Sequence, residues 1–445
     1  MSQHSSTQMN QTVMDASHVT GDGWRLRCVP RFVRLVLAGG FMFWEWSAHA
    51  QTRESLAGEE AAQALKKSIA AEEYNWSAGP VRLRTEANLR LGYTDNVFFS
   101  DEDRQADFLV NPEVALRGLW PVTDLNTLRL SLGLGYEWYL NNKSLNSDAP
   151  LINPDSELLF HVFVGDFRIR LREKFSYQES LFFNSTAGAV ERFFNFTDVG
   201  KFTRWDNLVG LEGVWDLNEL VLSAGYDHEN FMPVTSRFRY MERASEWFTA
   251  SAAFRLSDPV QVGLEGRGGL HDYEQETTLH DNWRARGGPF IELNTEEKIS
   301  LRAGGGFDTA RFDAPAAADG FDDYYAYGRI RQETRLFAHA LTASREHLLG
   351  DNADNLQLTQ VRYSISSPVV KHVEVGAELS VNFAEEFGGA FREEFDYYRA
   401  AVGIGYQFHK HWRTGLGYEF FIKNSDLPAR DFLRNRVSLY LTFAY

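Results

Sequence analysis

The sequence predicts an all-β fold, a transmembrane antiparallel up-and-down β-barrel of about 18 strands with a short N-terminal helical segment. Three observations support this prediction. The 445 residues are 14% aromatic, yet no apolar run approaches the roughly 20 residues that a membrane helix needs. Long segments alternate between apolar and polar residues, which is typical of half-buried strands. Short and long connections alternate between these segments, as they do in outer-membrane barrels.

The first 50 residues have the layout of a secretory signal peptide. Four arginines between positions 25 and 34 precede an apolar run over 35–46, and Ala48-His49-Ala50 supplies a small-x-small cleavage site before Gln51. A short membrane anchor and a disordered tail are the alternatives. Residues 51–78 combine alanines with charged residues, which favours a short periplasmic helix, with a loosely ordered tail as the alternative.

Residues 79–445 form the predicted barrel. Alternation is clearest over 81–93, 128–140, 373–383, 398–408 and 412–422, where one face is apolar with aromatic edges and the other is small, polar or charged. Several of these segments exceed ten residues, close to the 9–11 that a tilted strand needs to cross a bilayer. Strands of a soluble sandwich, the alternative fold, run about 5–6 residues. Segments near 323–345 and 354–366 alternate less regularly.

Connections between the segments are of two kinds. Short ones include 120–124, 165–166, 216–218, 257–259, Ser367-Pro368 and 409–411. Longer polar loops lie near 95–106, 141–156, 178–201, 229–242, 272–281, 308–323, 346–354, 386–396 and 424–430. This layout gives an even strand number, with both chain ends on the side of the short turns.

The chain ends on its most regular strand. One face carries the apolar residues Val437, Leu439, Leu441, Phe443 and Tyr445. In a closed barrel this strand pairs with the first one, because an open edge would leave backbone groups unsatisfied in lipid. The ending resembles the C-terminal assembly signal of bacterial outer-membrane proteins. That resemblance implies two partners, the outer-membrane lipid and the barrel-assembly machinery.

Charge is unevenly distributed along the chain, whose formal net charge is −16. Acidic residues crowd the long loops, whereas arginines recur on the polar strand faces. An arginine on the lipid face costs about 2–4 kcal/mol near the midplane, so these arginines are predicted to line the lumen. They are Arg82, Arg84, Arg90, Arg129, Arg168, Arg170, Arg172, Arg284, Arg286, Arg302, Arg399, Arg413, Arg434 and Arg436.

Two interpretations of these arginines are open. Charged rings allow pores to select by sign, so the lumen would favour anions. Alternatively, the arginines pair in structural ladders with Glu86, Glu137, Glu265, Glu374, Glu378 and Glu419.

The opening segment Leu89–Phe98 and the recurrent Gly-x-Gly-Tyr at 133–136, 403–406 and 415–418 resemble the β-barrel porin 2 family, as does the terminal strand. The resemblance covers about residues 80–445. It implies an outer-membrane barrel, often associated with exopolysaccharide production, without established catalytic residues.

No nucleophile, phosphate-loop or dinucleotide motif appears, so we expect no enzyme, no cofactor and no nucleic-acid partner. His409 and His411 lie in a short turn without further ligands, which favours a solvated turn over a metal site. We expect a porin-like channel in the outer membrane of a Gram-negative-type bacterium. It would pass a hydrophilic solute such as an anionic saccharide or an exported polysaccharide. The alternative is a non-conducting surface barrel for adhesion or envelope assembly.

Overall fold

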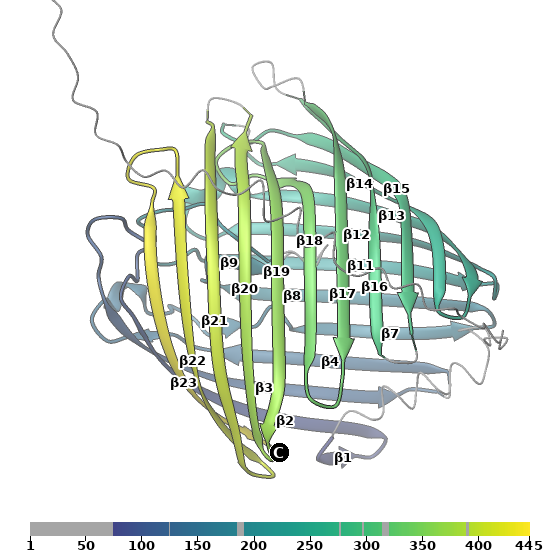
Figure 1. The fold of residues 1–445 in the computed structure, drawn as a ribbon, viewed down its shortest axis with the longest axis horizontal. Coiled ribbons are helices and arrows are strands. Elements are labelled where there is room, and N and C mark those ends of the chain that lie inside the picture. The colour runs from purple at the N-terminus through teal and green to yellow at the C-terminus, as the bar shows by residue number, and fades with distance from the viewer. Residues whose placement is uncertain are drawn as a thin grey trace, which may run out of the picture. The chain divides into compact units, whose positions relative to one another are not determined.

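Eighteen long antiparallel strands close into one barrel (Figure 1). The structure, a computed structural model, describes residues 74–123, 125–184, 191–275, 277–295, 298–313, 320–388 and 391–445, with only the backbone of 183, 184, 191 and 192. The barrel strands are β2 (Val81–Thr94), β3 (Asp107–Pro121), β4 (Asn126–Gly135), β7 (Glu157–Val164), β8 (Phe167–Gln178), β11 (Arg204–Asp216), β12 (Leu220–Pro233), β13 (Arg243–Ser257), β14 (Val260–Tyr273), β15 (Asn282–Asn294), β16 (Ile299–Phe312), β17 (Phe321–Glu333), β18 (Ala338–Leu349), β19 (Asn355–Val370), β20 (Val373–Phe387), β21 (Glu393–His409), β22 (Trp412–Ser425) and β23 (Phe432–Ala444).

The last strand closes the barrel on the first. The β2–β23 ladder runs from Glu86↔Ala444 to Thr94↔Arg436. The terminal residue extends it, since Tyr445 N donates to Thr85 O over 2.8 Å and Thr85 N donates to Tyr445 O over 2.8 Å. In Figure 1 the strands of the near wall cross those of the far wall, as expected for tilted strands. The sequence-based prediction of an antiparallel barrel and its strand number is confirmed.

The outer face of the barrel is apolar. Along β2, Leu89, Leu91 and Tyr93 are exposed and alternate with more buried residues of the other face. Aromatic side chains gather at both ends of the strands. Phe167 and Trp215 stack with ring centroids 5.0 Å apart next to short turns, and Tyr93 and Phe108 lie 5.1 Å apart next to a long loop. An apolar band between two aromatic girdles matches a bilayer.

Short turns and long loops alternate as the sequence predicts, with one difference. The predicted turn at Ser367-Pro368 lies within β19, and the turn is Lys371-His372. Pro368 is tolerated because the ladder shifts register between Pro368 and Val370, at a strand end. His372 takes a positive φ of 70°, which the tight turn requires.

Short elements lie outside the barrel wall. The loop after β4 holds β5 (Trp138–Tyr139), η1 (Lys143–Leu145) and β6 (Leu151–Ile152); the loop after β8 holds the hairpin β9 (Phe182–Asn184) and β10 (Glu191–Phe193); η2 (Ser236–Met241) precedes β13. Strand β1 (Trp76–Ala78) pairs with β2, so these three residues are strand and not part of a helix. The predicted signal peptide and residues 51–73 lie outside the described residues. Among the described residues, no helix is long and apolar enough to cross a membrane.

Candidate functional site

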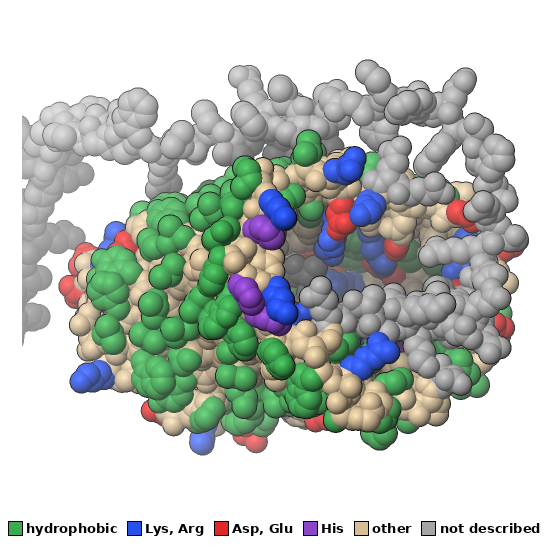
Figure 2. Space-filling model, turned by 90° about the horizontal axis from the view of Figure 1, so that it is seen from below, with side chains coloured by type: hydrophobic (Ala, Val, Ile, Leu, Met, Phe, Trp, Pro, Cys, Tyr) green, Lys and Arg blue, Asp and Glu red, His purple; other side chains and the backbone are tan. Residues whose placement is uncertain are grey.

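The lumen is lined by charged side chains. Figure 2 shows a hollow in the barrel with basic and acidic side chains on its walls. All fourteen arginines that the sequence singles out share the strand face opposite the exposed apolar residues, as the strand registers show. A role of these arginines in permeation stays a prediction.

At least seven of these arginines form ion pairs with carboxylates of the lumen wall. Arg399 lies 2.7 Å from Glu378 and 2.8 Å from Glu419. Arg302 lies 2.7 Å from Glu265 and 3.2 Å from Glu292. The paired arginines are Arg84, Arg170, Arg172, Arg286, Arg302, Arg399 and Arg413. These seven arginines pair with carboxylates, as expected if they form structural ladders. Five of the six glutamates that the sequence suggests as partners take part in these pairs.

Some of these pairs span more than neighbouring strands. Arg172 on β8 donates to Asp227 on β12, with Nη2–Oδ2 2.6 Å. The intervening strand β11 offers Gly210 at this level, and a Cβ built there would stand 2.0 Å from Asp227 Oδ1. Glycine is therefore required for the arginine to reach across.

Another group of arginines forms no direct ion pair in the described part of the chain. Arg90, Arg168 and Arg436 form no ion pair or hydrogen bond there. Arg90 and Arg436 lie on the paired strands β2 and β23, on either side of Gly92. Arg434 Nε donates to Thr94 over 3.1 Å, and its guanidinium lies 4.5 Å from the Phe99 ring centroid. These cations are not neutralised by contact.

The remaining arginines have other partners. Arg284 donates to Asn282, to Asn355 and to the Asp354 carbonyl, over 3.1, 3.2 and 2.8 Å. Arg82 and Arg129 each interact with a neighbouring group. The one expected glutamate without an ion pair among the described residues, Glu137, accepts from Tyr139 Oη over 3.3 Å.

The loop between β8 and β11 packs inside the barrel at its long-loop end. Phe193 lies 5.3 Å from Phe421 and 5.5 Å from Phe432, on β22 and β23. Phe196 lies 4.6 Å from Phe238, which belongs to η2 after β12. Consecutive residues of this loop therefore contact distant parts of the barrel rim. Among the described residues, nineteen buried apolar side chains, including these phenylalanines, form one cluster here.

Asn195 fastens this loop to the rim of the barrel. Its Nδ2 donates to Glu386 over 2.7 Å and to Glu393 over 2.6 Å, and its Oδ1 accepts from Lys423 Nζ over 2.6 Å. Its backbone N donates to Asp351 Oδ2 over 2.8 Å, and its carbonyl accepts from Arg430 over 2.7 Å. Each polar group of Asn195 thus has a partner.

The charged partners of the Asn195 side chain are fully buried. Lys423 and Glu393 have side chains that are 0% exposed and lie 2.7 Å apart. Buried charges are stable only when they are paired and hydrogen-bonded. Nearer the loop base, burial raises the pKa of Glu179, which accepts from Ser147 Oγ over 2.8 Å. This anchor is not visible in the sequence, because isolated charges at the ends of separate strands carry no spacing signal.

A recess of about 390 Å³ lies in the lumen wall near the short turns. Its floor contains glycines of β20 and β21, which leave the backbone open, and its sides include Glu374, Glu378, Arg413 and Tyr440. Arg413 lies 2.8 Å from Glu374, and both side chains are about half exposed. The Tyr440 ring lies so close to Gly415 that a Cβ there would stand 2.2 Å from it. The recess therefore offers an aromatic ring beside charged hydrogen-bonding groups.

No group of three or more potential metal ligands occurs in the described part of the chain. The expected solvated turn at His409 and His411 closes the β21–β22 hairpin. His411 Nδ1 lies 2.9 Å from the Ala444 carbonyl, and His411 N donates to His409 Nδ1 over 3.3 Å.

The barrel is similar in fold to solved porins of Pseudomonas. OpdK of Pseudomonas aeruginosa with vanillate is 13% identical, at a TM-score of 0.45, covering 82% of this chain and 99% of that chain. OccK2 (OpdF) of the same species in complex with glucuronate is 9% identical, at 0.46, covering 83% and 100%. A BenF-like porin from Pseudomonas fluorescens Pf-5 is 9% identical, at 0.48, covering 82% and 99%.

No family model and no curated protein matches the chain. The likeness to solved structures concerns the barrel fold. It supports neither the β-barrel porin 2 family nor the link to exopolysaccharide that the resemblance implied. The function of this chain therefore has to be inferred from its own side chains.

Proposed function

We propose that this chain is an outer-membrane channel that passes hydrophilic solutes and favours anions. The observation that carries the proposal is the contrast between the two faces of the closed barrel. The outer face is apolar, and the inner face carries arginines, of which Arg90, Arg168 and Arg436 form no ion pair with a described residue. Fixed positive charge in a narrow passage attracts anions and repels cations.

The recess supports a saccharide as the solute class. A sugar ring packs on an aromatic face, and its hydroxyls hydrogen-bond to carboxylates and guanidinium groups. Tyr440, Glu374 and Arg413 supply these groups side by side. An acidic saccharide would also be drawn by the unpaired arginines. An exported polysaccharide, which is built from such sugar units, is the alternative solute.

The location follows from the same barrel. An apolar band with aromatic girdles suits a bilayer, and closed barrels of even strand number are typical of the outer membrane of Gram-negative-type bacteria. We infer that residues 1–50 direct secretion and that the strand ending at Tyr445 is read by the barrel-assembly machinery.

The inserted loop favours a second candidate, a surface barrel that does not conduct. Its aromatic side chains and Asn195 hold it inside the long-loop end of the barrel. The two candidates differ in the current that they allow.

Single-channel recording in planar bilayers separates them. Protein purified from outer membranes should give discrete conductance steps in KCl, and an acidic sugar such as glucuronate should interrupt the current in a concentration-dependent way. A folded, heat-modifiable barrel that gives no conductance steps would instead favour the surface barrel.

A further inference from the structure

The outer surface of β8, β11, β12 and β13 carries polar side chains inside the apolar band. On β8 and β11 the band is marked by facing aromatic pairs, Phe167↔Trp215 near the short turns and Tyr177↔Trp205 near the loops. About ten residues separate these pairs along each strand, which is roughly 25 Å along the axis of a tilted barrel and equals the height of an apolar band. Glu173 lies between the two pairs, directly opposite Val209.

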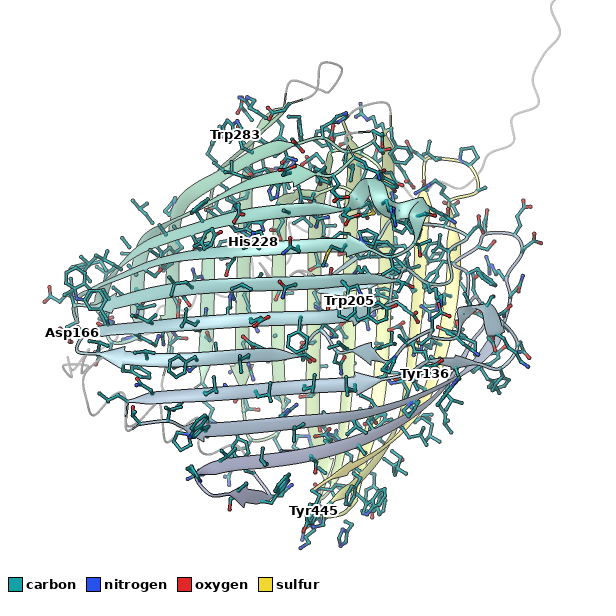
Figure 3. The ribbon with its side chains drawn as sticks, turned by 180° about the vertical axis from the view of Figure 1, so that it is seen from behind. Tyr136, Asp166, Trp205, His228, Trp283 and Tyr445 are labelled. Atoms are coloured by element: carbon teal, nitrogen blue, oxygen red, sulfur yellow. The ribbon has the colours of Figure 1, made fainter. Side chains whose placement is uncertain are left out.

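The other side of Val209 is polar as well. Val209 faces His228 on β12, and His228 faces Glu246 on β13. Figure 3 shows this wall from outside, with His228 farther from the long loops than Trp205. We call this group of polar side chains on the outer surface the belt patch. Its members are Glu173, Asn207, His228, Asn230 and Glu246.

The part of the belt patch on β12 and β13 is already ordered. His228 Nδ1 lies 2.8 Å from Glu246 Oε1, Asn230 Nδ2 lies 3.0 Å from His228 Nε2, and Tyr226 Oη donates to Glu246 over 2.5 Å. These contacts hold the imidazole and the Asn230 amide in place on the outer surface. Each amide nitrogen of Asn207 and Asn230 carries two N–H groups, and the contacts of each use only one.

Glu173 on the other side has no partner. Its side chain is exposed, and it forms no hydrogen bond or ion pair with any described residue. Acyl chains offer no hydrogen-bond donors, so an isolated carboxylate at this depth is costly in lipid. Intramembrane ionisable groups are typically functional and paired.

We propose that the belt patch is the contact surface for a second copy of this chain. Two copies in one membrane have the same orientation, so a twofold axis between them runs along the membrane normal. Such an axis beside Val209 exchanges the β8 side and the β12 side of the patch. It brings Glu173 of each copy toward His228 and Asn230 of the other, where both ring nitrogens of His228 have partners and the second N–H of the Asn230 amide has none among the described residues. The Glu173 carboxylate and this N–H of Asn230 lie on opposite sides of Val209, which makes the patch self-complementary.

Glu173 and His228 lie at similar depths in the membrane. Glu173 follows the short turn at Asp166 by about seven residues, and His228 follows Glu219 by about nine. The difference is roughly 5 Å along the barrel axis, which lies within the reach of these side chains. Val209 and Leu211 between them are each 47% exposed and supply an apolar centre.

Cysteine cross-linking tests the contact directly. In a Cys28→Ser background, Val209→Cys places one thiol beside the proposed axis. Val402→Cys is the matched control, because Val402 is a similarly exposed valine of the apolar band on β21. In intact outer membranes, mild oxidation should link Val209→Cys barrels into dimers and leave Val402→Cys monomeric. Monomeric Val209→Cys, equal linking of both variants, or linking to a different protein would overturn the proposal.

A second variant tests the polar contact. Glu173→Gln keeps the shape of the side chain but removes its charge, and it should lower the dimer association constant in mild detergent about tenfold, since two such contacts are lost per dimer. Heat modifiability reports that the barrel remains folded. Conductance per barrel should not change, so the result is independent of the channel function. An unchanged association constant would show that Glu173 does not contribute to the contact.

Discussion

Replacing Asn195 with alanine should release the inserted loop. The substitution removes three hydrogen bonds to charged groups, those with Glu386, Glu393 and Lys423. Hydrogen bonds to charged groups contribute about 1.5–3 kcal/mol each, and the Lys423–Glu393 pair survives the change. Three such bonds sum to about 4.5–9 kcal/mol, and we expect the inserted position to lose an amount at the lower end of this sum, about 4.5 kcal/mol. The ratio of released to inserted loop then rises roughly 2,000-fold.

Two assays follow the release. Because Phe193, Asn195 and Phe196 of this loop pack inside the long-loop end of the barrel, Asn195→Ala should raise the single-channel conductance or its fluctuations. Trypsin should cut at Lys201 in the same loop faster than in the parent. Asn424→Ala is the control, since Asn424 is exposed on β22 next to Lys423 and its side chain has no hydrogen bond with a described residue. Conductance and cleavage rates of Asn195→Ala that equal those of Asn424→Ala would refute the reasoning.

Three more predictions concern the recess and the two chain ends. Tyr440→Ala should weaken the block of ion current by a saccharide about fivefold, the effect of one aromatic contact, whereas Tyr418→Ala, which points to the outer face, should leave the block unchanged. Tyr445→Asp should abolish heat-modifiable barrel in the outer membrane while secretion persists, because the closing ladder would end in a charge at the lipid edge; normal assembly would contradict this. N-terminal sequencing of protein from outer membranes should begin at or near Gln51, and a start well upstream would disprove the signal peptide.

The sequence predicts most of the barrel because alternation alone decides which side chains face lipid. It succeeds least around β17 and β18, where alternation is weak. There the ladder runs only from Ala326↔Arg345 to Glu333↔Ala338. Beyond it, Arg345 Nη1 donates to the Tyr324 carbonyl over 2.7 Å, so a side chain takes the place of the missing strand contact. A hydrogen bond from a side chain to the neighbouring strand cannot be recognised from the periodic pattern of the sequence.

The lumen is only partly predictable for a different reason. Alternation assigns arginines to the inner face, but it does not tell which of them find a carboxylate. Arg172 reaches Asp227 across β11 only because Gly210 leaves space. Arg90 has no such partner among the described residues. The anchor of the inserted loop is less visible still, since Asn195 and Lys423 are 228 residues apart in sequence.

The reversal potential in a KCl gradient tests the central claim, a lumen that favours anions. The parent should be anion-selective, and Arg90→Ser with Arg436→Ser should move the potential toward cations. Arg170→Gln with Glu212→Gln removes an ion pair without changing the net charge, so this variant should keep the parent's potential. Cation preference in the parent, or an equal shift in both double variants, would contradict an anion-selective lumen set by its unpaired arginines.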